Sequence, residues 1–235
     1  MSVRVAINGF GRIGRNILRA IIENDNKNIN VVGINDLGPV STNAHLLKYD
    51  TIHGKLNKDI IVSENGIDVG YGSIKVTSIR EPEKLPWDEL NVDVVLECTG
   101  LFASKEKAEL HLKAGAKKVL VSAPASGADI TVVYGVNHTK ITKDHKIISN
   151  ASCTTNCLAP IAFVLNDAIG IENGFMTTIH SYTGDQPTLD TMHSDLYRSR
   201  AAAGNMIPTS TGAAKAVGLV LPELDGKLDG VAIRV

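Results

Sequence analysis

The sequence predicts an α/β protein in which a doubly wound parallel sheet is followed by a smaller α+β part. Three observations support this. A β-branched run over residues 3–8 leads through a glycine-rich turn into a helical pattern whose apolar face carries Ile13, Ile17, Leu18, Ile21 and Ile22. Further apolar runs at 31–35 and 92–97 alternate with helical segments, as in a parallel sheet covered on both faces. After residue 153 a helical run is followed by an alternating strand at 175–182.

The remaining elements complete this plan. We expect a short helix over 41–50 with Ser41 as its cap, and antiparallel hairpins over 60–79. A helix over 104–114 should lead to a strand at 118–122, and strands at 132–137 and 146–149 should close the sheet. The second part should contain a helix over 154–168, a polar loop over 188–204, a helix beginning at Ala213 and a strand over 231–235.

The composition is that of a globular protein. The 235 residues are 43% hydrophobic and 21% charged, with a formal net charge of -1, which argues against a dedicated nucleic-acid binder. No apolar run approaches the roughly 20 residues that span a bilayer. The N-terminus runs directly into a strand pattern, so we expect no signal peptide. Three cysteines, an odd and low count, favour reduced thiols and a cytoplasmic location.

The glycine-rich turn has the G-x-G-x-x-G pattern of a Rossmann-type dinucleotide site. Gly9 permits the tight turn, Gly11 allows close approach of a pyrophosphate, and Gly14 allows the helix to pack on the strand. Asp36 ends the next strand, where a carboxylate would accept hydrogen bonds from an adenosine ribose. The alternative is that the glycines only tighten the turn and Asp36 caps the following helix.

Cys153 is the expected nucleophile. It follows a strand and opens a helix, where free N–H groups and the helix dipole favour a thiolate. His180, at a strand end, is the best of seven histidines as its base, although a structural strand histidine would look the same. We expect the other histidines to be solvated, and Cys157 to pack as a small hydrophobe. A Cys-x-x-x-Cys pair without a second ligand pair predicts no metal site.

An anion pocket is a further possibility in the second part. Its candidate residues are arginines and hydroxyls that lie in loops or at element ends: Arg198, Arg200, Arg234, Thr183, Thr209, Ser210 and Thr211. Gly212 at a helix start would add N–H donors. The alternative is a solvated loop.

Four segments together resemble one known family. NGFGRIGR at 8–15, SNASCTTNC at 149–157, HSYTGDQ at 180–186 and PTSTGAAK at 208–215 closely resemble phosphorylating glyceraldehyde-3-phosphate dehydrogenase. The resemblance runs through the whole chain. It implies an NAD-binding domain over 1–152 and a catalytic domain over 153–235 that is incomplete at its C-terminus relative to the family.

The resemblance also implies residue roles. Cys153 would attack the aldehyde of glyceraldehyde 3-phosphate, and His180 would take the proton. The cofactor site would be formed by Gly9, Gly11, Arg12, Ile13, Gly14, Asp36, Thr99 and Ser122. The substrate's phosphate would be held by Thr183, Asp185, Arg198 and Arg234. Inorganic phosphate would be held by Ser152, Thr154, Thr211 and Gly212, with Arg234 shared. A homotetramer would be the full-length form.

The sequence departs from the family pattern at three positions in two places. Gly184 stands where many NAD-dependent members have asparagine, and Thr191-Met192 stands where they usually have Leu-Pro. Asp36 favours NAD, because a carboxylate repels a 2′-phosphate, whereas the loop leaves room for NADP.

The sequence is also compatible with two other functions. Erythrose-4-phosphate dehydrogenase shares the cysteine, the histidine and the cofactor site, with water replacing phosphate as acceptor. A non-catalytic nucleotide- or RNA-binding role is the alternative from another class, and it is weakened by the near-neutral charge.

Overall fold

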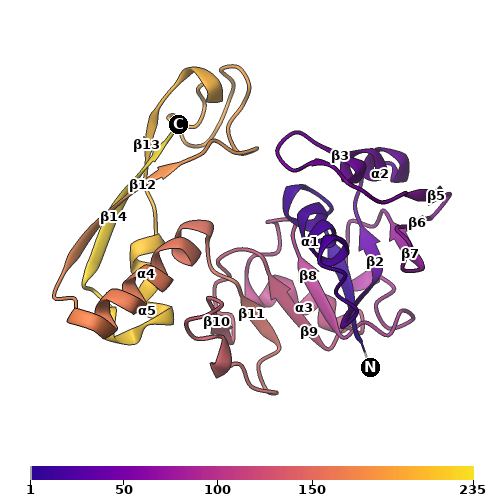
Figure 1. Ribbon diagram of the computed structural model, residues 1–235, viewed down its shortest axis with the longest axis horizontal. Coiled ribbons are helices and arrows are strands. Elements are labelled where there is room, and N and C mark those ends of the chain that lie inside the picture. Colours follow the sequence, from indigo (N-terminus) through magenta and orange to yellow (C-terminus); the bar gives the residue numbers. More distant parts are fainter. Residues whose placement is uncertain (1) are drawn as a thin grey trace. The chain divides into compact units, whose positions relative to one another are not determined.

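The computed structural model describes residues 2–235, which form two compact units (Figure 1). Unit 1 contains the chain up to Thr131 and the segment Ile141–Asn150. Unit 2 contains Val132–Lys140 and Ala151–Val235. The domain boundary predicted between residues 152 and 153 stays a prediction. Within the described residues no helix combines the length and hydrophobicity that a membrane crossing requires.

Unit 1 is built on a nine-stranded sheet in the order β10-β11-β9-β8-β1-β2-β7-β6-β5. From β10 to β7 all neighbouring strands are parallel, and β6 and β5 extend the sheet as antiparallel hairpins. Its strands are β1 (Val3–Asn8), β2 (Ile29–Asn35), β5 (Ile61–Ser63), β6 (Gly66–Asp68), β7 (Ser73–Thr77), β8 (Val94–Glu97), β9 (Lys118–Val121), β10 (Ile130–Thr131) and β11 (Ile147–Ser149). A separate pair joins β3 (Tyr49–Asp50) to β4 (Gly54–Lys55). The predicted parallel sheet is confirmed.

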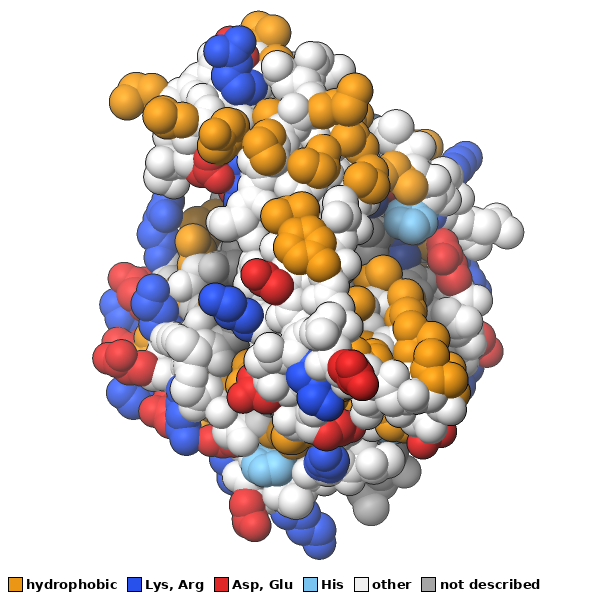
Figure 2. Space-filling view, turned by 90° about the vertical axis from the view of Figure 1, so that its left-hand side faces the viewer, with side chains coloured by type: hydrophobic (Ala, Val, Ile, Leu, Met, Phe, Trp, Pro, Cys, Tyr) orange, Lys and Arg blue, Asp and Glu red, His pale blue; other side chains and the backbone are white. Residues whose placement is uncertain are grey.

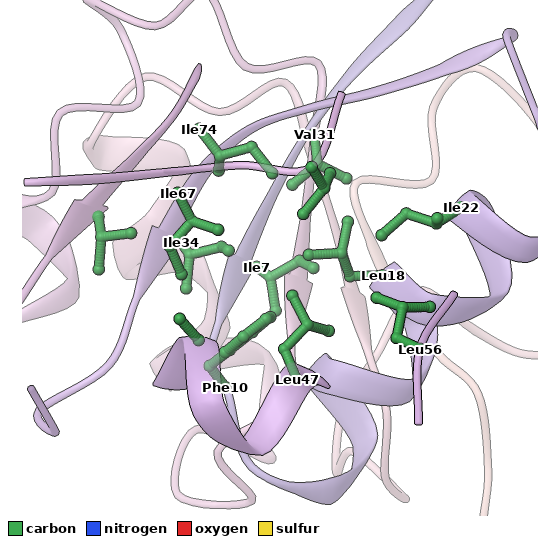
Figure 3. Close-up of a cluster of buried hydrophobic side chains, with 13 residues drawn as sticks. Ile7, Phe10, Leu18, Ile22, Val31, Ile34, Leu47, Leu56, Ile67 and Ile74 are labelled. Atoms are coloured by element: carbon green, nitrogen blue, oxygen red, sulfur yellow. The ribbon is translucent and has the colours of Figure 1, made fainter. Parts of the chain in front are cut away.

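Helices cover both faces of this sheet. The helices of unit 1 are α1 (Arg12–Glu23), α2 (Val40–Lys48), α3 (Lys105–Lys113) and the 3-10 turn η1 (Pro82–Lys84). Adjacent strand residues enter opposite cores, because side chains alternate across a strand. Ile7 packs with residues of α1 and α2, as Figure 3 shows. Ala6 belongs to a second core on the opposite face, together with Val95 of β8 and Ala108 of α3. The fold is therefore doubly wound, as predicted.

Unit 2 contains a three-stranded sheet and two packed helices. Its elements are η2 (His138–Lys140), α4 (Cys153–Ile169), β12 (Gly174–His180), η3 (Ala202–Gly204), β13 (Ile207–Thr209), α5 (Ala213–Val220), η4 (Pro222–Leu224) and β14 (Leu228–Arg234). The sheet order is β12-β14-β13, with β14 parallel to β12 and antiparallel to β13. The α4 and α5 helices share an apolar core that includes Ala159, Val217 and Leu224.

Apolar side chains gather on the face of unit 2 that Figure 2 turns to the viewer. On β12, alternate residues such as Phe175 and Ile179 are exposed, whereas His180 is half-buried. The exposed large apolar side chains of α4 are Ile161, Phe163, Val164, Leu165 and Ile169. The alternation along β12 places His180 on the better-covered side of its strand.

Three local predictions are wrong. No strand forms over 132–137, because the chain turns at Gly135, whose φ is +83°, and Asn137 accepts a hydrogen bond from the Val133 N–H. The α2 helix begins at Val40 after Pro39, so Ser41 lies inside the helix and does not cap it. Ile13, expected on the apolar face of α1, is 50% exposed.

Candidate functional site

The glycine-rich turn of unit 1 joins β1 to α1 in the way its pattern predicts. Gly9 has a φ of +89°, and a Cβ at this position would lie 2.8 Å from Thr99. A Cβ on Gly14 would lie 2.2 Å from the carbonyl oxygen of Gly9, so only glycine lets the helix approach the turn this closely. A Cβ on Gly11 would meet nothing within 4 Å, and no side chain caps α1. The N-terminus of α1 is thus open to an anion.

A pocket of about 360 Å³ lies beside this turn. It opens at the carboxyl ends of the parallel strands, where ligands bind in open α/β sheets. Its lining residues are Asn8, Gly9, Gly11, Asn35, Asp36, Leu37, Ile79, Arg80, Cys98, Thr99, Leu101 and Phe102. Four of the predicted cofactor residues, Gly9, Gly11, Asp36 and Thr99, belong to it.

Asp36 joins the pocket wall to the glycine-rich turn. Its Oδ2 accepts a hydrogen bond from the Phe10 N–H at 2.8 Å, and its Oδ1 accepts one from the Gly38 N–H at 2.9 Å. The carboxylate does not cap α2, which begins at Val40. Asp36 therefore lies at the pocket as an acceptor, with the ribose role still a prediction.

The other predicted cofactor residues lie outside this lining. Arg12 forms an ion pair with Asp50, and Ile13 is half exposed on the first turn of α1. Ser122 follows β9, where its N–H donates to the carbonyl of Glu97 at 3.0 Å. Gly14 faces the turn itself.

The strand-end asparagines of the pocket were not singled out from the sequence. Asn8 and Asn35 are the last residues of β1 and β2, and both are buried. A polar residue that closes an apolar parallel strand is the signal that would have found them, because it falls at the ligand-binding edge of the sheet.

Unit 2 brings the predicted nucleophile and base together. Cys153 is the first residue of α4, and Ser152 caps the helix by accepting a hydrogen bond from the Thr155 N–H at 3.0 Å. The Sγ of Cys153 lies 3.2 Å from Nε2 of His180. The other ring nitrogen, Nδ1, lies 2.6 Å from the carbonyl oxygen of Ser181, which can only accept. Nδ1 therefore carries the proton, and Nε2 is free to accept one from the thiol.

The other two cysteines lack this arrangement. Burial raises the pKa of the Cys98 thiol to about 11, which disfavours its thiolate near neutral pH. Cys157, expected to pack as a small hydrophobe, is exposed one turn further along α4. That expectation is wrong, because the outward side of α4 at this turn is open to solvent.

An arginine cluster lies at the same end of the β12–β14 sheet as His180. Arg234 is opposite His180 in the β12–β14 register, and its guanidinium donates to Thr183 Oγ1 at 3.2 Å and Gln186 Oε1 at 3.3 Å. Burial, followed by the positive charge of Arg198, lowers the pKa of Arg234. Its Nε is buried without a hydrogen-bond partner among the described residues. Two neighbouring guanidinium groups with an unused donor are suited to bind an anion.

Asp185 and the loop after it position Arg198. The guanidinium of Arg198 donates to Asp185 Oδ2 at 2.7 Å and lies 3.3 Å from Asp195 Oδ2. Arg200 instead pairs with Asp190 at 3.2 Å within the loop, so the structure does not bring it into this cluster.

The remaining predicted phosphate residues lie at helix starts or strand ends. Thr154 is in the first turn of α4. Thr211 accepts a hydrogen bond from the Ala213 N–H at 3.2 Å, and Gly212 immediately precedes α5. Thr209 is buried on β13 and Ser210 is exposed. The described residues hold no group of three or more histidine, cysteine or carboxylate side chains that could bind a metal ion.

A dinucleotide-type pocket in one unit and a histidine-paired thiol beside arginines in the other are the parts of an oxidoreductase that acts through a cysteine. Comparison with known proteins agrees. Residues 3–105 match the family model of the glyceraldehyde 3-phosphate dehydrogenase NAD binding domain, and residues 152–235 match that of its C-terminal domain. The chain belongs to the glyceraldehyde-3-phosphate dehydrogenase family, and its cofactor is NAD.

Curated relatives match along the whole chain. Glyceraldehyde-3-phosphate dehydrogenase of Xanthobacter flavus is 72% identical over 235 residues, which are 100% of this chain and 70% of the relative. The enzymes of Cereibacter sphaeroides and Pseudomonas aeruginosa are 68% and 57% identical, again over all of this chain, and over 70% and 71% of their own lengths.

Proposed function

We propose that the protein oxidises and phosphorylates D-glyceraldehyde 3-phosphate to 1,3-bisphosphoglycerate, a step of glycolysis and gluconeogenesis, while NAD⁺ is reduced. The observation that carries the chemistry is the 3.2 Å approach of Cys153 Sγ to His180 Nε2. Family membership supplies the substrate class. We further propose residues 1–152 as the NAD-binding domain and 153–235 as the catalytic domain.

The pocket of unit 1 fits the dinucleotide. Gly11 leaves open space where a pyrophosphate would approach, and Asp36 offers a carboxylate for a ribose. Gly9, Gly14 and Thr99 shape the turn, and Arg12, Ile13 and Ser122 are proposed to complete the site. NAD⁺, when bound, supplies the hydride acceptor for the oxidation.

The residues of unit 2 carry the covalent steps. His180 Nε2 accepts the proton of Cys153, whose thiolate then attacks the aldehyde carbon to give a thiohemiacetal. The protonated imidazole and the N–H groups at the start of α4 stabilise the developing oxyanion. After oxidation the sulfur carries a thioester, which inorganic phosphate attacks at the carbonyl carbon. The acyl phosphate leaves, and the thiolate is restored.

Two anion sites are assigned to the hydroxyls and arginines. Thr183, Asp185, Arg198 and Arg234 would hold the phosphate of the substrate, with Asp185 orienting Arg198. The attacking phosphate would be held by Ser152, Thr154, Thr211 and Gly212, with Arg234 shared. The unused Nε donor of Arg234 supports this assignment.

The dependence on inorganic phosphate tests the proposal. NADH formation from glyceraldehyde 3-phosphate should require phosphate or its arsenate analogue. Oxidation that proceeds equally without phosphate would favour a hydrolytic enzyme such as erythrose-4-phosphate dehydrogenase. Salt-sensitive RNA binding without NAD binding would favour the non-catalytic alternative.

We also propose that the protein acts in the cytoplasm, as its low and odd number of cysteines indicates, and that its full-length form is a homotetramer, as the family resemblance implies. Light scattering on the purified full-length protein tests the oligomeric state, and a monomer at micromolar concentration would contradict a homotetramer.

A further inference from the structure

A buried polar network lies beneath the dinucleotide pocket and plays no part in the chemistry described above. Its centre is Glu97, the last residue of β8, which is 1% exposed. Its Oε2 accepts hydrogen bonds from Asn8 Nδ2 at 2.6 Å and His111 Nε2 at 2.9 Å. Its Oε1 accepts hydrogen bonds from the N–H and the hydroxyl of Thr99 at 2.8 and 2.5 Å. Every partner donates to Glu97.

The direction of these bonds on the histidine side is determined by Trp87. The indole N–H of Trp87 can only donate, and it lies 3.0 Å from His111 Nδ1. His111 therefore carries its proton on Nε2, facing Glu97. His111 was predicted to be solvated, and this is wrong: it is fully buried.

The bonds on the other side have equally determined directions. The Ile79 N–H donates to Asn35 Oδ1 at 2.9 Å, so the amide nitrogen of Asn35 donates to Asn8 Oδ1 at 2.8 Å. Asn8 must then present its own amide nitrogen to Glu97. Three unambiguous donors, on Ile79, Trp87 and Thr99, thus require a carboxylate that only accepts. Burial raises the pKa of Glu97, but the hydrogen bonds from His111, Thr99 and Asn8 outweigh it and hold the pKa below its ordinary value.

The network reaches the pocket wall at several points. Asn8, Asn35, Ile79 and Thr99 all line the pocket, whereas Glu97 lies behind them. The hydroxyl of Thr99 also accepts a hydrogen bond from the Leu101 N–H at 3.0 Å, which shapes the turn after β8. The rings of His111 and Phe102, another lining residue, pack edge to face with their centroids 6.2 Å apart.

A buried charge is costly, and an apolar core in its place would be at least as stable. The observed partners give the charge a more specific use, since the network orders the side chains of Asn8, Asn35 and Thr99 at the ligand-binding edge of the sheet. We propose that Glu97 is a positioning residue for NAD: its carboxylate orders Asn8, Thr99 and the β8 turn in the shape that the dinucleotide requires. This inference rests on the proposed function, in which this pocket holds NAD.

The primary test is Glu97→Gln, which keeps the shape of the side chain but replaces one acceptor oxygen with a donor. The new amide must face either Asn8 and His111 or the Thr99 N–H, so at least one donor loses its acceptor. We expect the dissociation constant for NAD, measured by calorimetry, to rise about tenfold or more. In assays the KM for NAD should rise while kcat at saturating NAD changes little.

Val95→Ala is the matched control for a loss of stability. Val95 lies on the same strand and the same face, is fully buried and contacts the apolar core. This variant should lower the melting temperature while the dissociation constant for NAD stays within about twofold.

A second pair of variants keeps the inference falsifiable if Glu97→Gln fails to fold. His111→Leu removes the donor to Glu97, whereas His111→Gln retains an N–H near the position of Nε2, and His111 does not line the pocket. NAD binding should weaken in the leucine variant and be largely kept in the glutamine variant. Trp87 is the only tryptophan, so its single indole N–H resonance reports on the network directly. That resonance should shift more in Glu97→Gln than in Val95→Ala.

The outcomes separate the two hypotheses. A wild-type protein that does not bind NAD overturns the proposed function, and this inference with it. If the wild-type protein binds NAD and Glu97→Gln or His111→Leu binds it with the same affinity, the inference alone is overturned. The same holds if Val95→Ala loses as much affinity for NAD as Glu97→Gln.

Discussion

The Sγ of Cys153 lies 3.2 Å from Nε2 of His180, although 27 residues separate them in the chain. Cys153 opens α4, and His180 ends β12 within the same unit. The Ser181 carbonyl accepts a hydrogen bond from the Nδ1–H group, which leaves Nε2 as the acceptor for the thiol. This geometry suits a thiol that must be deprotonated before it attacks.

Replacement of the nucleophile should separate the two cysteines of α4. Cys153→Ser should lower kcat for glyceraldehyde 3-phosphate at least about a thousandfold, because the serine hydroxyl is not deprotonated by this histidine at neutral pH. Cys157→Ser is the control and should retain most activity, since Cys157 has no such histidine partner. Comparable losses of kcat in the two variants, measured in steady-state assays, would show that Cys153 is not the nucleophile.

Removal of the base should leave a thiol that reacts slowly. His180→Asn should lower kcat by about 10²–10⁴-fold, the range typical of a general base. The rate of alkylation of Cys153 at neutral pH, followed by peptide mass spectrometry, should fall as well. An unchanged alkylation rate would show that His180 does not assist deprotonation.

The glycines of the turn provide a matched pair. Gly14→Ala should destabilise the protein by about 1–3 kcal/mol, because its Cβ would overlap the Gly9 carbonyl oxygen. Gly11→Ala should fold normally, because a Cβ there meets nothing within 4 Å, but it should weaken NAD binding by intruding on the pyrophosphate. Urea titration and calorimetry measure the two effects. Destabilisation by Gly11→Ala would contradict this division.

The carboxylate of Asp36 should set the cofactor preference. Asp36→Ala should weaken the binding of NAD more than the binding of NADP. The change removes an acceptor for the ribose hydroxyls of NAD, and it also removes a negative charge that repels the 2′-phosphate of NADP. Asp36→Asn is the companion variant, since it keeps the side-chain shape and one of the two oxygens that accept hydrogen bonds from the Phe10 and Gly38 N–H groups. An unchanged NAD-to-NADP ratio in both variants would remove the ribose role.

Stability at low pH should depend on Asp129. Its partners are Lys105 and the N–H groups of Lys146 and Ile147, and these outweigh burial to lower its pKa from 3.8 to about 2. The unfolded chain binds the proton first as the pH falls, so this stabilisation is complete above pH 4 and disappears towards pH 2. Asp129→Asn should cost about 1 kcal/mol at pH 7 and nothing near pH 2. Urea unfolding of the wild type and of Asp129→Asn across this pH range checks the prediction. A difference in stability between the two proteins that does not change with pH would contradict it.

Much of the fold could be predicted because the signals are local. The glycine-rich turn, the hairpins around Gly66 and Tyr71, and the start of α4 at Cys153 each depend on a few adjacent residues with particular backbone demands. The prediction of a strand at 132–137 was wrong. Val132 and Val133 are apolar and buried, as in a strand, but the chain turns sharply at Gly135.

The sequence by itself determined the class of each unit, the place of the dinucleotide turn and the residue that opens α4, because periodicity and glycine positions express local preferences. Only the tertiary structure decided that His180 meets Cys153, that Arg234 lies beside Thr183, and that His111 is buried on Glu97. Those contacts join residues far apart in the chain. They depend on strand register and on which helix covers which face, and no short stretch of sequence encodes either.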